Sequence, residues 1–172
     1  TAIQLLDTKT AAGAGGLIAV EAARAALSSL SLKEVQAVAE GIVPKVNLLA
    51  FLETLYYLSR SGRIPKVAAW VGSILGVRPL TELRSGEAHL LARPRSRANA
   101  KTRLLEIMRE RVGDRRVHAN VMHANSPEDA QELRQRIAAS LNCAEILVSE
   151  FTPVMGAHTG PGLLGVAFYT ET

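Results

Sequence analysis

The sequence predicts an α/β domain in which helices pack on a mixed, largely antiparallel sheet. Apolar patterns typical of helices and of strands alternate along most of the chain. A hairpin signal in the middle of the chain favours antiparallel pairing over a purely parallel sheet. With 172 residues, 48% of them hydrophobic, the chain can bury a sizeable core and is compatible with one domain.

The first 30 residues are typical of half a β-α-β unit. A strand is expected over Ala2–Leu6, followed by a small-residue loop, Ala11–Gly16, that opens the helix Leu17–Leu30. Backbone N–H groups of such a loop can meet an anion, but its glycines lack the G-x-G-x-x-G spacing of a dinucleotide site. Close packing of the helix on a sheet is the better interpretation of these small residues.

The next segment begins with a capping box, because Ser31 is followed three residues later by Glu34. Gly62 suits the end of a helix and Pro65 prevents that helix from continuing. The elements expected here are helix Leu32–Lys45, strand Asn47–Leu52, helix Glu53–Arg60 and helix Lys66–Leu75.

The second half of the chain contains the hairpin, with Arg84–Glu87 as its loop. Ser126 followed by Pro127 is typical of an N-cap with proline at the first helical position. The expected elements are strands Val77–Leu83 and Ala88–Leu91, helix Asn99–Val112, strand Arg116–His123, helix Glu128–Leu141, and strands Glu145–Glu150 and Leu163–Tyr169.

A turn is expected directly before the last strand, at His158-Thr159-Gly160-Pro161-Gly162. Two glycines flanking a proline cannot continue a regular helix or strand. The turn places the His158 imidazole and the Thr159 hydroxyl at the edge of the apolar interior, where they can hold the polar end of a mostly apolar ligand. A common turn with a structural histidine is the alternative, and turn chemistry explains most of the pattern.

Composition excludes several classes of function. No apolar run approaches the roughly 20 residues of a membrane helix, and no signal peptide is apparent. Cys143 is the only cysteine, which fits a reducing compartment, so we expect a cytoplasmic protein. The formal charge is +4, but aromatic residues amount to 4%, which leaves few platforms for nucleic-acid bases. A solvated, arginine-rich face is favoured over a phosphate or acidic-partner site for the clusters Arg93, Arg95 and Arg97, and Arg109, Arg111, Arg115 and Arg116.

Four segments carry a resemblance that covers nearly the whole chain. They are Asp7-Thr8-Lys9 with the loop to Gly16, Leu52–Leu58 running into Gly62-Arg63-Ile64, Ile74–Leu80 with Gly86-Glu87, and His158–Gly162. In this order and spacing they resemble the DegV family of bacterial fatty-acid-binding proteins. Members are longer at the N-terminus, and this chain begins at Thr1 directly on an apolar run, so we expect a fragment.

The resemblance implies two α/β domains with a long acyl chain buried between and within them. Residues 1–46 would be a remnant of the N-terminal domain, and residues 47–172 the C-terminal domain that binds the lipid tail. Such proteins present the fatty acid carboxylate to a partner fatty acid kinase, which forms the acyl-phosphate, and do not themselves catalyse the transfer. His158 matches the family's C-terminal histidine near the carboxylate, whereas the principal hydroxyl ligands lie upstream and have no counterpart here.

The site expected from this resemblance has a headgroup end, a tail end and a partner contact. His158, Thr159 and Gly160 would hold the carboxylate through charge-assisted hydrogen bonds, and Arg63 would contact the kinase or a phosphate, or else bond helix-end carbonyls. No metal or cofactor is expected beside the fatty acid. Candidate tail-lining residues, for each of which ordinary core packing is the alternative, are Phe51, Leu55, Leu58, Val71, Ile74, Leu75, Leu164, Val166 and Phe168.

Two other functions compete with lipid binding. An enzyme would use His118, His123 or His158, but the sequence has no nucleophile motif, H-E-x-x-H or phosphate loop. His118 and His123 are five residues apart on an expected strand, so they face opposite sides and cannot form a helical metal pair. A basic nucleic-acid-binding domain or a purely structural α/β domain is the other alternative.

Overall fold

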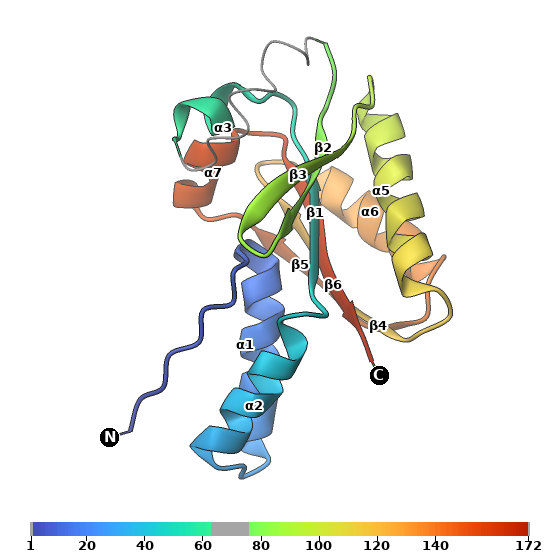
Figure 1. The fold of residues 1–172 in the computed structure, drawn as a ribbon. Coiled ribbons are helices and arrows are strands. Elements are labelled where there is room, and N and C mark those ends of the chain that lie inside the picture. The colour runs from blue at the N-terminus through green and yellow to red at the C-terminus, as the bar shows by residue number, and fades with distance from the viewer. Residues whose placement is uncertain (1, 63–75, 172) are drawn as a thin grey trace.

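A six-stranded sheet organises the chain in the order β3-β2-β1-β6-β4-β5 (Figure 1). The computed structural model describes residues 2–62 and 76–171. Every pair of neighbouring strands is antiparallel except β4 and β5, so the predicted mixed, largely antiparallel α/β class is confirmed. The strands are β1 (Asn47–Phe51), β2 (Leu80–Arg84), β3 (Glu87–Ala92), β4 (Val117–His123), β5 (Cys143–Glu150) and β6 (Leu164–Thr170).

The connections between strands explain these pairings. Ser85 and Gly86, with φ of 52° and 80°, form the tight turn between β2 and β3. A turn with two positive φ values matches the twist of an antiparallel pair. Helix α6 (Pro127–Ala138) connects β4 to β5, the parallel pair of the described sheet, because parallel neighbours need a crossover connection.

The two faces of the sheet carry different helices. Residues of β1, β4 and β6 alternate between the faces because side chains in a strand point to opposite sides. Leu49, Phe51 and Val121 face α5 (Arg97–Val112) and α6, and with them form the largest buried cluster. Leu48 and Met122 face the other side, which is covered by α1 (Ala12–Leu27) and, farther along, by α3 (Tyr56–Arg60).

Helix α1 begins five residues earlier than its expected start at Leu17, and the predicted small-residue loop is wrong. Residues 12–16 form its first turns because they let the helix approach β4 closely. A Cβ on Gly13 would lie 2.6 Å from the Met122 sulfur and 2.8 Å from the Asn120 amide nitrogen. The interpretation of these small residues as packing residues is therefore confirmed.

The strand expected over Ala2–Leu6 is also wrong. These residues are not in a strand and pair with none of the six strands, and Ile3 and Leu5 are 80% and 91% exposed. An apolar run forms a strand only where another strand supplies hydrogen bonds, and the described residues offer none here.

Helix starts follow their sequence signals well. The capping box of Ser31 and Glu34 begins α2 (Leu32–Ile42), and Ser96 caps α5. A short helix that was not expected, α7 (Pro153–Thr159), follows β5. The helix expected at Lys66–Leu75 lies outside the described residues. Among the helices described, none combines the length and the apolarity that crossing a bilayer requires.

Candidate functional site

The candidate site lies where α3 and α7 meet beside the start of β6 (Figure 1). Helix α7 begins with Thr152 as its cap and Pro153 at the first position, and it includes His158 and Thr159. The turn before β6 therefore begins after Thr159, whereas the sequence predicts that it begins at His158. Because Pro153 lacks an N–H and has a fixed φ, it starts a helix readily, and Gly160 ends that helix.

Gly160 and Gly162 make the turn that leads into β6. Their φ values of 79° and 82° lie in the left-handed region, which residues with a Cβ rarely adopt. A Cβ on Gly160 would lie 2.3 Å from the ring of Tyr57, so the turn packs directly against α3. The glycines are thus required both by backbone conformation and by space.

Most hydrogen-bond donors of this turn already have partners. The Thr159 hydroxyl donates to the carbonyl of Met155 at 2.9 Å, and the Gly160 N–H donates to the carbonyl of Gly156 at 2.8 Å. The Gly162 N–H donates to the carbonyl of Ala124 at 2.7 Å. These groups are not free to bind a carboxylate as expected from the sequence.

His158 differs from its neighbours. Its half-buried imidazole makes no hydrogen bond or ion pair with any residue in the described part of the chain. Of the three expected headgroup residues, His158 alone therefore offers a free side-chain donor.

An apolar cluster lies close to this turn on the same face of the sheet. Its buried members come from the segment that follows β1, from α3 and its N-cap, from β3, and from the residues next to β4 and β6: Leu52, Leu55, Leu58, Ala88, Ala124 and Leu163. Two candidate tail residues, Leu55 and Leu58, belong to it and are 5% and 7% exposed. Ala50, Val77, Leu90 and Phe151 pack at its margin.

Four other candidates lie on the opposite face of the sheet. Phe51, Leu164, Val166 and Phe168 pack against α5 and α6 in the largest cluster. The sheet separates them from Leu55 and Leu58, so the candidates cannot all line one cavity. The remaining candidates, Val71, Ile74, Leu75 and Arg63, lie outside the described residues.

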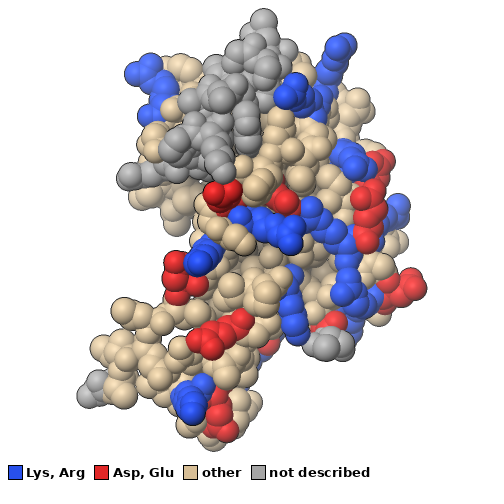
Figure 2. Space-filling model, in the orientation of Figure 1, with Lys and Arg blue, Asp and Glu red and all other residues tan. Residues whose placement is uncertain are grey.

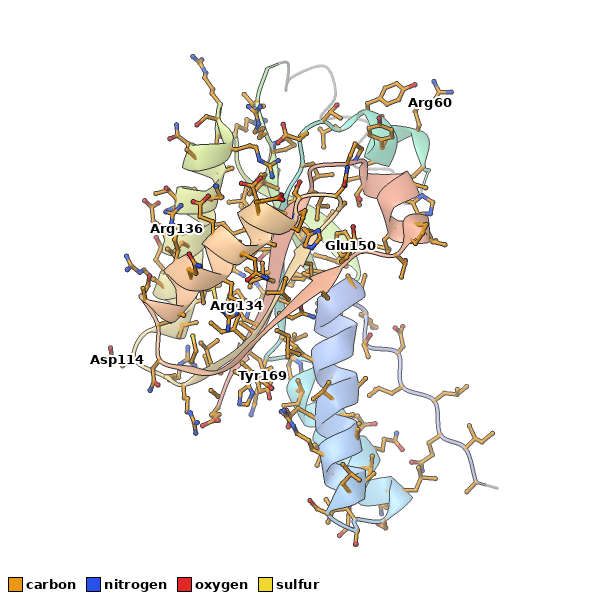
Figure 3. All side chains as sticks on the ribbon, turned by 180° about the vertical axis from the view of Figure 1, so that it is seen from behind. Arg60, Asp114, Arg134, Arg136, Glu150 and Tyr169 are labelled. Atoms are coloured by element: carbon orange, nitrogen blue, oxygen red, sulfur yellow. The ribbon has the colours of Figure 1, made fainter. Side chains whose placement is uncertain are left out.

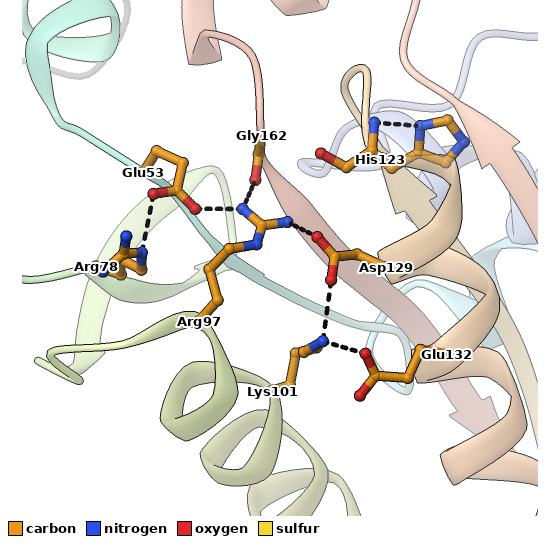
Figure 4. A network of polar contacts seen from close by, with 9 residues as sticks. Glu53, Arg78, Arg97, Lys101, His123, Asp129, Glu132 and Gly162 are labelled. Atoms are coloured by element: carbon orange, nitrogen blue, oxygen red, sulfur yellow. Dashed lines mark hydrogen bonds and ion pairs between the residues drawn. The ribbon is translucent and has the colours of Figure 1, made fainter.

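A network of charges holds the turn from the other side (Figure 4). The Arg97 guanidinium donates to the Gly162 carbonyl at 2.7 Å and forms ion pairs with Glu53 and Asp129. Its carbon lies 5.3 Å from the centre of the Phe51 ring. Arg97 therefore joins the end of β1, the turn before β6 and the start of α6.

Lys101 extends this network along α5. Its ammonium binds Asp129 at 2.9 Å and also pairs with Glu132. Burial opposes ionisation of Asp129, but hydrogen bonds from Lys101 and Arg97 outweigh it, so the pKa of Asp129 lies below its ordinary value. The carboxylate is thus held in its charged form.

Arg97 was expected on a solvated arginine-rich face, and that prediction is wrong for this residue. Its side chain is 24% exposed, whereas Arg93 and Arg95 are exposed as expected. No local signal distinguishes the three arginines. The carboxylates that recruit Arg97 come from positions 44 and 32 residues away in sequence.

A second polar cluster ties α1 to the sheet near Tyr169 (Figure 3). His118 stacks on Tyr169 with ring centres 4.7 Å apart and bonds Glu145 at 2.9 Å. Arg24 of α1 donates to both oxygens of Glu145, at 2.9 and 2.8 Å, and pairs with Glu21. Glu21, His118 and Glu145 could together contact one metal ion, but the bidentate guanidinium already neutralises Glu145.

The ion pairs of Glu145 should make the free energy of unfolding depend on pH in the acid range. The hydrogen bond from Arg24 is the main reason that the pKa of Glu145 falls from 4.5 to about 2. A carboxylate with a lowered pKa in the folded state stabilises the fold above its unfolded pKa and loses this contribution as pH falls from 4.5 towards 2. We expect Glu145→Gln to cost about 1 kcal/mol at pH 7, after allowance for solvent screening, and nearly nothing at pH 2. Urea unfolding of both proteins across this range measures the difference, and a constant gap at all pH values would contradict it.

Basic and acidic residues are interspersed on the surface seen in Figure 2. Several arginines are paired within the described residues, including Arg78 with Glu53 and Arg111 with Glu82. On the face seen in Figure 2, acidic side chains lie next to the basic ones, as expected for a solvated surface with ion pairs.

The mixed sheet and the helices that pack on both of its faces define a layered α/β protein. The family model that matches, described as an uncharacterised protein of the DegV family, aligns with residues 1–171. The chain belongs to the DegV family.

Relatives and solved structures agree with this family. A DegV domain-containing protein of Streptomyces coelicolor is 37% identical over 165 residues, which are 95% of this chain and 59% of that protein. A structure described as fatty acid binding of a DegV family protein from Thermus thermophilus has a TM-score of 0.90 at 29% identity, and covers 98% of this chain and 61% of that one. The fatty acid binding protein DegV of Bacillus subtilis has a TM-score of 0.84 at 26% identity, over 96% and 60% of the two chains. The chain thus spans about three fifths of these relatives.

Proposed function

We propose that this chain binds a long-chain fatty acid, with its carboxylate at His158 and its tail along the apolar cluster around Leu55 and Leu58. The observation that carries the proposal is that the His158 imidazole has no hydrogen-bond or ion-pair partner within the described residues, while its helix α7 packs against α3, which carries Leu58 of that cluster. Two similar structures are described as fatty acid binding, which supports the same ligand class. A carboxylate that leaves water needs a charge-assisted donor, and imidazolium supplies one.

The position of the acyl tail in the proposed site follows from which apolar cluster lies on which face of the sheet. Burying an acyl chain gains about 0.8 kcal/mol per CH₂, so most of the affinity comes from apolar contact. We assign the tail to the face of Leu52, Leu55, Leu58 and Leu163, and leave Phe51 and Val166 to the core under α5 and α6.

The wider role rests on what lies beyond this chain. Since the chain spans about three fifths of its relatives, we propose that further headgroup donors come from the rest of a longer protein. In this proposal residues 1–46 belong to the N-terminal domain of the longer protein, and residues 47–172 form the C-terminal domain that binds the lipid tail. The protein presents the carboxylate to a cytoplasmic fatty acid kinase for acyl-phosphate formation, contacts it through Arg63, and does not itself catalyse the transfer.

Lipid extraction and mass spectrometry test the proposal directly. The intact protein incubated with palmitate or oleate should carry a stoichiometric fatty acid, and His158→Ala should weaken binding about tenfold through the lost charge-assisted bond. His89→Ala removes an exposed imidazole from β3 and should bind as wild type. Thr159→Val should also bind normally, because the Thr159 hydroxyl is already engaged by Met155. Absence of lipid from the wild type would refute the function, whereas equal binding by His158→Ala and His89→Ala would refute only the role of His158.

A further inference from the structure

A cavity lies at the opposite end of β1 from the proposed fatty acid site. Its volume is about 550 Å³. The register of β1 places Phe51 beside Leu164, near the Gly162 turn, and Asn47 beside Phe168, four residues farther along the strand. Asn47 lines the cavity, together with residues from the segments 8–10, 43–48 and 82–85 and with Arg111. The segment that precedes α1 and the end of β2 with its hairpin turn thus form two of its sides.

The lining of this cavity has an excess of positive charge. Lys9, Arg84 and Arg111 face one carboxylate, Glu82, which Arg111 binds at 2.7 Å. The ammonium of Lys9 and the guanidinium of Arg84 make no hydrogen bond or ion pair within the described part of the chain. Glu87 lies opposite Arg84 in the hairpin register but does not line the cavity. Two positive charges therefore have no ion-pair partner among the described residues.

One hydroxyl in the same cavity also lacks a partner. Thr10 Oγ1 is the buried side-chain polar atom that has no hydrogen bond among the residues described. Buried polar groups in native proteins are nearly always satisfied, so an exception indicates a missing partner. The hydroxyls of Thr8 and Ser85 also line the cavity and can donate to further oxygens.

We propose that this cavity binds a small phosphate-bearing anion. Lysine and arginine side chains with several hydroxyls match the many acceptor oxygens of a phosphate, and the fork of Arg84 can bind two of them. No aromatic side chain lines the cavity, so it has no stacking surface for a nucleobase. The ligand is therefore a free phosphate or diphosphate, or the phosphate end of a small metabolite.

Calorimetric titration of the intact protein with pyrophosphate tests the site. Arg84→Met should weaken binding about tenfold, the loss expected for one charge-assisted hydrogen bond. Arg134→Met is the matched control, because Arg134 is exposed on α6, does not line this cavity and forms no ion pair within the described part of the chain (Figure 3). Equal loss in both variants would show attraction by net charge alone and would overturn the site. Parallel titrations with orthophosphate and glycerol 3-phosphate then distinguish a free phosphate from an ester.

Thr10→Val gives a second readout that a purely structural role cannot reproduce. Without ligand the variant should unfold at an equal or higher temperature, since it removes an unpaired buried hydroxyl. Its affinity for pyrophosphate should nevertheless fall. Lower stability with unchanged affinity would place the hydroxyl outside the anion site and overturn the proposal, as would the absence of pyrophosphate binding by the wild type.

Discussion

Replacing Arg97 by methionine should destabilise the protein by about 2–3 kcal/mol. The substitution keeps much of the aliphatic stem but leaves Glu53 and Asp129 facing each other without the guanidinium between them. It also removes the donor to the Gly162 carbonyl. These groups are 24–29% exposed, so the expected loss is smaller than for a fully buried pair. Urea unfolding at pH 7 measures it.

The control for this variant is Arg103→Met on the same helix. Arg103 pairs with Glu106 and Glu110 on the exposed side of α5, and exposed pairs contribute little. The stability of Arg103→Met should stay close to that of the wild type. A loss in Arg97→Met no larger than in this control would mean that the network of Figure 4 contributes no stability.

The Arg97 variant should also respond differently to acid. The lowered pKa of Asp129 means that its pairing stabilises the folded protein above the unfolded pKa of the carboxyl and is lost as pH falls. Since Arg97 supplies part of that pairing, the gap between wild type and Arg97→Met should narrow in acid.

Gly160→Ala should be the most damaging single methyl addition near the site. Two costs combine, because alanine is strained at a φ of 79° and its Cβ would lie 2.3 Å from the Tyr57 ring. The backbone cost is about 1–2 kcal/mol and overpacking adds about 1–3 kcal/mol. We expect a clear loss of stability in thermal unfolding and a displaced His158, seen as weaker fatty acid binding.

Gly113→Ala separates the two costs. Gly113 also ends a helix with a positive φ, 59°, but a Cβ there would meet nothing within 4 Å. The Gly113→Ala variant should therefore lose only the stability that the strained backbone conformation costs. Adding Tyr57→Ala to Gly160→Ala should relieve the clash and reduce the extra cost, and equal losses in Gly160→Ala and Gly113→Ala would show that Tyr57 simply moves aside.

Sequence signals located most elements because those signals are local. The capping box at Ser31 and the proline after Ser126 begin helices whatever lies around them. The same kind of signal, Thr152 followed by Pro153, also begins α7, although the Gly-Pro-Gly turn after it is the more conspicuous feature of this segment. At Ala2–Leu6 the local signal fails, because a strand also needs a neighbouring strand.

The sequence by itself determined the α/β class, the hairpin, the buried last strand and the family of this protein. Its alternation of apolar residues also separates Phe51 from Leu52, but alternation does not say which face of the sheet meets α3 and α7. Only the tertiary structure decided that, and it decided that Arg97 lies between Glu53 and Asp129. The physical reason is distance along the chain: capping and turn geometry depend on residues a few positions apart, whereas helix docking and ion pairing join segments dozens of residues apart.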